Sequence, residues 1–430
     1  MNNQQTEALA PLAINGGEPT IPTPFKRYNS LGREEQVAVQ EVMESGVLSQ
    51  FLGCWHDDFY GGKKVRQFEQ QCAEFFKVKH AITVNSWTSG LIAAVGALDI
   101  EPGDEIIVSP WTMCASATAI LHWNAIPVFA DIDSRTFNLD PASVRANITE
   151  KTKAIMAVDI FGLSADMTAL RAIANEFGLK LISDTAQAPG AMYGDQFAGT
   201  LADIGGYSLN YHKHIHTGEG GVIVTNDDAL AERLRLIRNH AEAVIPGMGE
   251  RPLNNMLGYN FRLGELECAI GIEQLKKLPR LVQSRQHLAE RLIAGLSGLK
   301  GLGLPYTPDG STHVYYIFPM VLDIAQLGCS RADIAQALKA EGVDVGTQYQ
   351  NLHLLPMYQQ KIAYGKHGFP WSAEFSRPTV TYAKGICPVA EGLNDASYMG
   401  FGMCVYDLSN DDIDLIVAAF RKVWAHLVSE

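Results

Sequence analysis

One lysine lies in a segment whose composition suits reactive chemistry. Residues 207–221 read Tyr-Ser-Leu-Asn-Tyr-His-Lys-His-Ile-His-Thr-Gly-Glu-Gly-Gly, with Lys213 near the middle and apolar runs on both sides. Partial loss of water lowers the pKa of a lysine ammonium group, and the neutral amine is a nucleophile toward an aldehyde. Because a loop lysine is usually a solvated surface charge, Lys213 is a candidate nucleophile only if other residues support that role.

Two further positions are suited to binding a ring and an anion. Asp184 follows an apolar run, and the carboxyl end of a buried strand is where open α/β sheets bind ligands. A carboxylate there can pair with a protonated ring nitrogen and hold a pyridine as its cation. Residues 84–90, Val-Asn-Ser-Trp-Thr-Ser-Gly, place hydroxyl groups at the start of a predicted helix, where backbone N–H groups attract anions. Ordinary capping explains the same residues, so each signal is weak alone.

Seven short apolar runs predict the strands that would position these residues. They are 81–86, 105–110, 126–132, 154–161, 179–185, 203–209 and 221–226. Most are continuous, which is typical of strands covered on both faces, and several of the segments between them have helical spacing of apolar residues. The repeated order of strand and helix predicts an α/β fold with a mostly parallel seven-stranded sheet.

The remainder of the chain is predicted to be helical at first and then to form a smaller unit. Helices are expected at 228–239, 263–278 and 282–296, the last two separated by Pro279. The Gly- and Pro-rich stretch 298–310 marks the boundary between a large domain, 1–297 with an N-terminal arm 1–30, and a small C-terminal α+β domain, 298–430.

Local signals also predict the elements of the C-terminal part. Residues 313–322 alternate like a half-exposed strand. Ser330 with Asp333, and Ser409 with Asp412, are typical of capping boxes that open the helices 332–341 and 413–428.

Charge and composition exclude several classes of protein. The chain has 430 residues, 34 basic and 47 acidic, and a formal net charge of −13. No basic run offsets this charge, so nucleic acid is not expected as a partner. No apolar stretch reaches the ~18 residues that a membrane span needs, so no membrane is expected either. The polar N-terminus and seven scattered cysteines favour a cytoplasmic protein with reduced thiols and no metal site.

The order and spacing of the chemical signals are more specific than any one of them. A phosphate-type loop near 86, an acid at 184, a serine at 208 and a lysine at 213 resemble the fold-type I enzymes that use pyridoxal 5′-phosphate. Within these, the sequence resembles the DegT/StrS family of sugar aminotransferases over nearly the whole chain. The motifs that carry the resemblance include 14–19 Ile-Asn-Gly-Gly-Glu-Pro, 127–133 Pro-Val-Phe-Ala-Asp-Ile-Asp, 217–221 Thr-Gly-Glu-Gly-Gly and 258–263 Gly-Tyr-Asn-Phe-Arg-Leu.

The resemblance implies a role for each candidate residue. Lys213, five residues before the Gly-Glu-Gly-Gly stretch, would be the lysine that carries the cofactor covalently. Asp184 would pair with the pyridine nitrogen, and Gln187 would lie near the ring oxygen. The residues implied to hold the phosphate are Trp87, Thr88, Ser208 and, from a neighbouring subunit, Asn260. The protein is therefore expected to be a homodimer with shared active sites.

Two positions depart from the family pattern. Trp87 stands where the family usually has glycine, and Met113 stands where an aromatic ring usually stacks on the cofactor, with Trp111 two residues earlier. A thioether can cover a ring face, so Met113 stays a candidate for that role. His353 resembles a family residue near the acceptor, and His212 and His214, which flank Lys213, are further candidates for substrate contact.

The expected reaction is transfer of an amino group from glutamate or glutamine to the ketone of a nucleotide-linked keto sugar or a cyclitol. One branch of the family has histidine in place of the lysine and acts as a dehydratase; Lys213 favours transamination because histidine cannot form the covalent link. A metal site built from His212, His214, His216 and Asp184 is a less favoured alternative, since it leaves Lys213 and Ser208 without a role.

Overall fold

The structure is a computed structural model that describes residues 10–377 and 379–428. Residues 1–9 of the predicted N-terminal arm lie outside the described residues. None of the helices in the described ranges is both long enough and apolar enough to cross a membrane.

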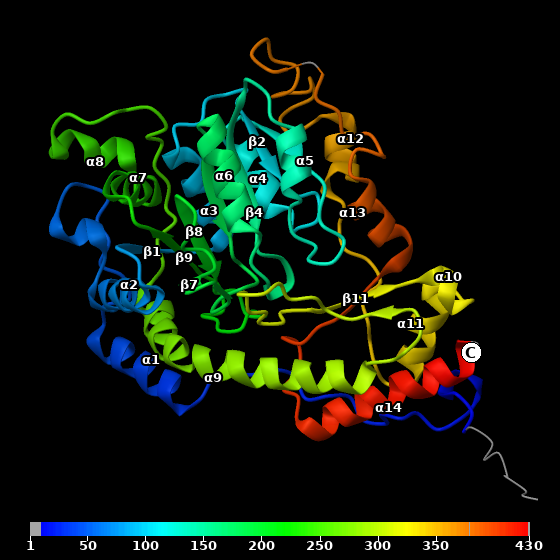
Figure 1. Ribbon diagram of the computed structural model, residues 1–430. Coiled ribbons are helices and arrows are strands. Elements are labelled where there is room, and N and C mark those ends of the chain that lie inside the picture. Colours follow the sequence, from blue (N-terminus) through cyan, green and yellow to red (C-terminus); the bar gives the residue numbers. More distant parts are fainter. Residues whose placement is uncertain (1–9, 378, 429–430) are drawn as a thin grey trace, which may run out of the picture.

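A seven-stranded sheet forms the centre of the molecule, and its strands match the seven predicted runs (Figure 1). The strands are β1 (His80–Val84), β2 (Glu105–Val108), β3 (Ile126–Phe129), β4 (Thr152–Val158), β5 (Lys180–Asp184), β8 (Ile204–Ser208) and β9 (Gly221–Thr225). Their order is β1-β9-β8-β5-β4-β2-β3. Only β9 runs against its neighbours β1 and β8, while the other pairs are parallel. The prediction of a mostly parallel sheet is confirmed.

Helices cover both faces of this sheet, which explains why its strands are apolar on both sides. One face packs against α3 (Trp87–Ala97), α4 (Ala115–His122) and α7 (Asp228–Arg238). The other face packs against α5 (Pro141–Ala146) and α6 (Met167–Phe177) near β4, and against α2 (Lys63–Phe76) near β9. Ile106 and Ile107, adjacent on β2, belong to these two opposite cores.

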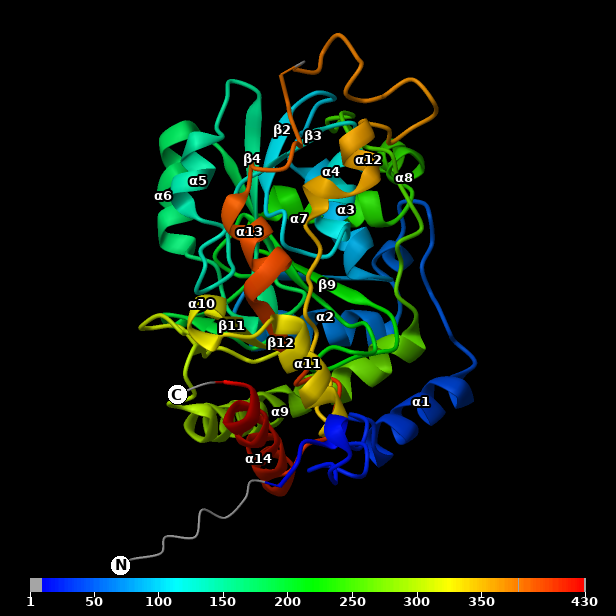
Figure 2. The same ribbon diagram turned by 90° about the vertical axis from the view of Figure 1, so that its right-hand side faces the viewer.

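A single long helix, α9 (Glu265–Leu296), runs beneath the sheet and packs against α1 (Arg33–Ser45), α2 and α14 (Asn410–Leu427) (Figures 1 and 2). The prediction of two helices separated at Pro279 is wrong, because the helix continues through this residue. A proline removes one backbone donor and disturbs one turn. Leu275, Leu278 and Val282 remain buried on one stripe across the proline, and this packing holds the helix together.

The C-terminal part contains a three-stranded antiparallel sheet of β10 (Leu302–Gly303), β11 (Phe318–Leu322) and β12 (Tyr398–Phe401). The predicted strand 313–322 is confirmed only from Phe318 onward. Its first half bonds elsewhere: Val314 N donates to Gly162 O, and Ile317 N donates to Phe161 O. These bonds join the region before β11 to the loop after β4.

Both predicted capping boxes are present. Asp333 N donates to Ser330 Oγ at the start of α11 (Arg331–Ala340), and Asp412 N donates to Ser409 Oγ at the start of α14. The remaining elements are short. They are β6 (Met192–Tyr193), β7 (Gln196–Phe197), α8 (Ala241–Met248), α10 (Ile324–Leu327), α12 (Pro356–Gln360), α13 (Pro388–Gly392) and five further short helices, η1 (Ala13–Asn15), η2 (Asp57–Tyr60), η3 (Ile160–Gly162), η4 (Leu352–Leu354) and η5 (Leu393–Ser397).

Candidate active site

One pocket at the carboxyl edge of the large sheet collects most of the predicted site residues. It is formed where β1, β5 and β8 end, because these three strands run in the same direction. The predicted residues that line it are Trp87, Thr88, Met113, Asp184, Gln187, Ser208, His212 and Lys213. Residues from position 87 to position 213 are thus brought together by the parallel strand order.

The start of α3 forms one wall of the pocket. The Ser86 side chain caps the helix and accepts a hydrogen bond of 3.1 Å from Ser89 N, while Thr88 lies in the first turn. Ser208 lines the same pocket, as does Asn210, whose Nδ2 donates to Glu219 Oε1 at 2.8 Å. Helix N–H groups and hydroxyls are donors suited to a phosphate, so this part of the pocket fits a small anion without any surface cation.

Asp184 is a buried side chain of the pocket that is held by hydrogen bonds. It is 5% exposed, and both of its carboxylate oxygens accept hydrogen bonds. Trp87 Nε1 lies 2.7 Å from Oδ1, and Ser116 Oγ lies 2.7 Å from Oδ2. These two bonds hold the carboxylate in one orientation.

Lys213 approaches the same space from the loop between β8 and β9. Its side chain is buried, and its Nζ lies 4.3 Å from the centroid of the Tyr316 ring. Burial lowers the pKa of Lys213 to about 8, although the negative charge of Asp184 acts in the opposite direction. A considerable fraction of the amine is therefore neutral near physiological pH, as a nucleophile or proton acceptor requires.

The loop between β8 and β9, residues 209–220, is called the lysine loop here, and its three histidines lie in different surroundings. His212 lines the pocket, and burial followed by the charge of Lys213 lowers its pKa to about 4. The His214 ring is fully buried with Nε2 2.8 Å from Val314 O, and His216 N donates to Gln274 Oε1 at 3.3 Å. The described residues contain no group of three or more side chains placed to hold a metal ion. The alternative of a histidine metal site therefore has no geometric basis here.

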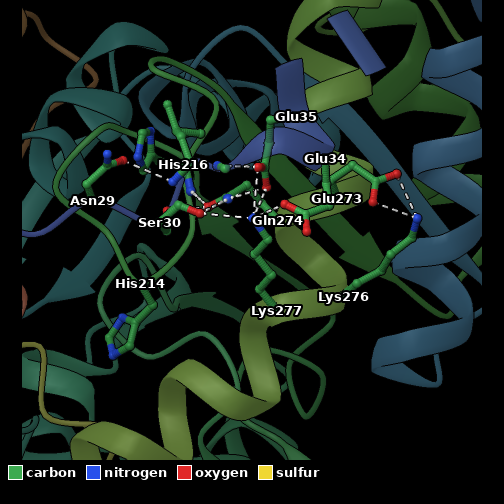
Figure 3. A network of polar contacts seen from close by, with 12 residues as sticks. Asn29, Ser30, Glu34, Glu35, His214, His216, Glu273, Gln274, Lys276 and Lys277 are labelled. Atoms are coloured by element: carbon green, nitrogen blue, oxygen red, sulfur yellow. Dashed lines mark hydrogen bonds and ion pairs between the residues drawn. The ribbon is translucent and has the colours of Figure 1, made fainter. Parts of the chain in front are cut away.

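A polar network behind the loop fixes its backbone. Gln274, fully buried on α9, accepts from Ser30 Oγ at 2.6 Å and donates to Glu35 Oε1 at 2.7 Å, and Glu35 also pairs with Lys277 (Figure 3). The His214 ring lies apart from this network, while His216 is joined to it (Figure 3). The lysine loop is thereby tied to α1 and α9.

Gln187 and the aromatic residues near it are also fixed in place. Gln187 Oε1 accepts from Phe161 N at 2.8 Å, and its Nε2 donates to Tyr349 OH at 3.0 Å. Trp111 is fully buried and stacks on Tyr349, with ring centroids 5.8 Å apart. Met113 is 59% exposed and lines the pocket, so Met113 rather than Trp111 is placed to cover a bound ring.

Three predicted residues lie outside the pocket. His353 is fully buried with Nε2 2.8 Å from Glu391 Oε1, and His214 is enclosed as described, so direct substrate contact by these two side chains does not agree with the structure. Neither ring can reach a substrate, because both are buried and already hydrogen-bonded within the protein. Asn260 is exposed, and its Oδ1 accepts from Arg262 Nε at 2.8 Å. The Asn260 carbonyl accepts from Asn85, next to the start of α3.

Sequence reasoning missed several residues around the pocket, namely Ser116, Asn210, Glu219, Tyr316 and Tyr349. Asn210 and Glu219 lie within the predicted reactive segment and hydrogen-bond each other at 2.8 Å, so their proximity to Lys213 was a usable signal. Ser116, Tyr316 and Tyr349 come from distant segments, and nothing in their local sequence marks them.

The arrangement defines a class of enzyme. A mostly parallel α/β sheet, a buried lysine and a buried carboxylate in one pocket, and an anion-binding helix terminus together make the pocket of a fold-type I pyridoxal-phosphate enzyme, and the donor set of this chain fits that cofactor. Residues 30–384 match the DegT/DnrJ/EryC1/StrS aminotransferase family, to which the chain therefore belongs. The enzyme is an aminotransferase.

Individual relatives agree with this assignment. The chain is 32% identical to GDP-perosamine synthase of Vibrio cholerae, covering 81% of this chain and 90% of that protein. It is 32% identical to L-glutamine:2-deoxy-scyllo-inosose aminotransferase of Streptomyces lividus, covering 96% and 98%. The crystal structure of an aminotransferase from Psychrobacter cryohalolentis superposes with a TM-score of 0.81 at 29% identity, covering 94% and 100% of the two chains.

Proposed function

We propose that the protein moves an amino group from glutamate or glutamine to the ketone carbon of a sugar or cyclitol. The observation that carries this proposal is that Lys213 and Asp184 line one pocket with the start of α3. The names of the relatives supply the substrate class: one refers to a nucleotide-linked amino sugar, the other to glutamine and a cyclitol ketone.

The pocket residues have distinct roles toward pyridoxal 5′-phosphate. When bound, this group supplies an electron sink for the carbon that loses or gains a proton. The N–H groups of the first turn of α3, with Thr88 and Ser208, would hold the phosphate. Asp184 would pair with the ring nitrogen, Gln187 would bind near the ring oxygen, and Met113 would cover one ring face, since all of these residues line the pocket.

Lys213 binds the cofactor covalently at rest and moves the proton during the reaction. In its neutral form, Nζ would accept a proton from the α-carbon of the amino donor and would deliver it to the C4′ carbon of the cofactor. Burial of the amine, which lowers its pKa, makes this neutral form accessible. His212 stays neutral beside it and adds no competing positive charge.

The acceptor enters through a second pocket that adjoins the cofactor pocket. Thr112 and Met113 line both pockets, so a molecule in the second pocket reaches the cofactor pocket. Its amide side chains are Gln348, Gln350, Asn351 and Asn394. Amides donate and accept hydrogen bonds, and they therefore suit the hydroxyl groups of a sugar or cyclitol.

The active enzyme is a cytoplasmic homodimer in this proposal. Large apolar side chains are exposed on α1 and the segment after it, including Met43, Leu48 and Trp55, and again at Leu253 and Leu257. A second subunit bound at these side chains would remove their apolar surface from water, which favours association. Asn260, exposed in its own chain, would then complete the phosphate site of the partner.

The half-reactions of the purified enzyme test the proposed function. With pyridoxal phosphate bound, glutamate or glutamine should bleach the cofactor's visible absorbance, and a sugar or cyclitol ketone should restore it with release of an amino product. Aspartate and a simple keto acid serve as the comparison donor and acceptor. Protein that stays colourless with added cofactor, or that is bleached by no amino acid, would refute the proposal.

The pKa of Lys213 sets the pH dependence of cofactor capture. Only the neutral amine attacks the cofactor's aldehyde, so the capture rate by apoenzyme should fall about tenfold per pH unit below pH 8 and level off above it. Stopped-flow absorbance between pH 6 and pH 10 measures this rate. A lysine peptide, with a pKa of about 10.4, is the control and should still gain rate at pH 10. A flat profile for the enzyme would contradict the expected titration.

A further inference from the structure

The indole of Trp87 is enclosed beside the carboxylate that faces the cofactor ring. It is 4% exposed, although Trp87 is the first residue of α3, and Nε1 donates to Asp184 Oδ1 at 2.7 Å. Asp184 lies 97 positions further along the chain, so this contact is created by the fold. A glycine at position 87, as the family usually has, would offer no side-chain donor here.

Two glycines shape the slot that holds the indole. A Cβ atom on Gly206 of β8 would lie 2.2 Å from Trp87 Cζ3, and one on Gly90 of α3 would lie 2.6 Å from Cε3. Both distances are well below van der Waals contact, so any side chain at these positions would displace the ring. The slot therefore fixes the direction in which the Trp87 N–H points.

Ser116 provides a second donor on the opposite carboxylate oxygen. Its Oγ lies 2.7 Å from Asp184 Oδ2 and 3.1 Å from Thr112 Oγ1. Oδ1 already accepts two hydrogen bonds, from Trp87 Nε1 and from Ala186 N at 3.3 Å, whereas Oδ2 accepts one, from Ser116. A lone pair of Oδ2 is therefore left for a ring N–H. These bonds fix the plane of the carboxylate.

We propose that Trp87 is a positioning residue that, with Ser116, holds the Asp184 carboxylate in place and aimed at the ring nitrogen of pyridoxal phosphate. The proposal rests on the proposed function, because it requires that cofactor. Asp184 held in this way keeps the ring nitrogen protonated, and a positively charged ring withdraws electrons more strongly. Loss of the Trp87 donor should then slow proton removal from the amino donor.

Trp87→Phe in the cofactor-loaded enzyme tests this role, because phenylalanine keeps an aromatic ring and removes the N–H. We expect the first half-reaction with the amino donor to slow about 10- to 100-fold, in line with loss of one hydrogen bond to a charged group, with little change in KM. We also expect a change in the pH titration of the cofactor's absorbance, which reports protonation of the nitrogen that links Lys213 to the cofactor. Without a positive charge on the ring this nitrogen is more basic, so the midpoint of the titration should rise.

Trp123→Phe is the matched control. Trp123 is also buried in the core on the same face, and its Nε1 donates to a backbone carbonyl, Ile92 O, at 2.7 Å. A general loss of packing would affect both variants, whereas only Trp87→Phe should move the absorbance midpoint. If both variants titrate and react like the wild type, the proposal is overturned.

If Trp87→Phe no longer binds the cofactor, Ser116→Ala tests the proposal instead. This variant removes the other donor to Asp184 with a smaller change in side-chain volume. A raised absorbance midpoint in Ser116→Ala supports the proposal, and an unchanged midpoint overturns it. Wild-type protein that fails to take up pyridoxal phosphate would refute the proposed function itself. If the wild type takes up pyridoxal phosphate but Trp87→Phe reacts and titrates like the wild type, only the positioning role of Trp87 is refuted.

Discussion

Lys213→Ala should eliminate amino transfer. The variant loses both the nucleophile that carries the cofactor and the group that moves the proton, and proton transfer by a positioned side chain alone contributes about 10²- to 10⁴-fold to rate. We therefore expect a fall in kcat of at least about 10⁴-fold. Borohydride reduction followed by intact-mass measurement should find the cofactor attached to the wild type and absent from the variant.

Two further variants separate this role from charge and folding. Lys213→Arg keeps a positive charge but cannot become neutral, so it should be as inactive as Lys213→Ala. Lys153→Ala removes an exposed lysine on β4 and should behave like the wild type. A Lys213→Ala protein that still carried reducible cofactor would show that another amine forms the link, and the assignment of this site would be wrong.

Mixed dimers should recover activity from two inactive chains. Lys213→Ala lacks the attachment lysine, and Asn260→Ala, assayed at limiting cofactor, lacks a phosphate contact. If Asn260 serves the partner's pocket, a heterodimer has one pocket with both residues intact. Random pairing of equal amounts makes half of the dimers mixed, so about a quarter of the wild-type activity is expected from a dimer with two equivalent sites.

The control for this experiment is one chain carrying both substitutions, mixed with wild type. Its heterodimers then contain one pocket that lacks Lys213 and one that lacks the partner's Asn260, so at limiting cofactor neither pocket is complete. Wild-type homodimers, a quarter of the dimers, should give about a quarter of the wild-type activity, whereas about half is expected if Asn260 serves its own chain. The Asn260 side chain also has a contact within its own chain, since its Oδ1 accepts from Arg262 Nε at 2.8 Å. If mixing restores no activity, Asn260 does not serve the partner's pocket.

Continuous apolar runs made the large sheet predictable from sequence. Strands such as Glu105–Val108 and Gly221–Thr225 are buried along their whole length, and this burial leaves an unambiguous local pattern. Two elements were mispredicted where tertiary contacts override local preference. Pro279 is tolerated inside α9 because the helix is packed on both sides of it, and 313–317 bonds to the loop after β4 in place of a strand partner.

The pocket was predictable to the extent that its residues follow strand ends. Asp184, Ser208 and Thr88 each lie at or just after the carboxyl end of a strand, and the parallel order brings them together. Contacts between distant segments were not predictable. Nothing near Ser116 or Tyr349 in sequence indicates that they bond to Asp184 and Gln187, and nothing near His353 indicates that its ring is paired with Glu391.

The slot around Trp87 also constrains how related sequences can vary. An indole at position 87 requires that positions 90 and 206 lack a Cβ, since both Cβ atoms would overlap the ring. Position 206 is restricted in any case, because a Cβ there would also lie 2.3 Å from the backbone oxygen of Val222, whereas a Cβ on Gly90 meets chiefly the Trp87 ring. Substitutions at positions 87 and 90 should therefore be coupled during evolution, with tryptophan gained only where position 90 already has glycine. The same coupling would make the tryptophan hard to lose, because its removal leaves an unfilled cavity in the core.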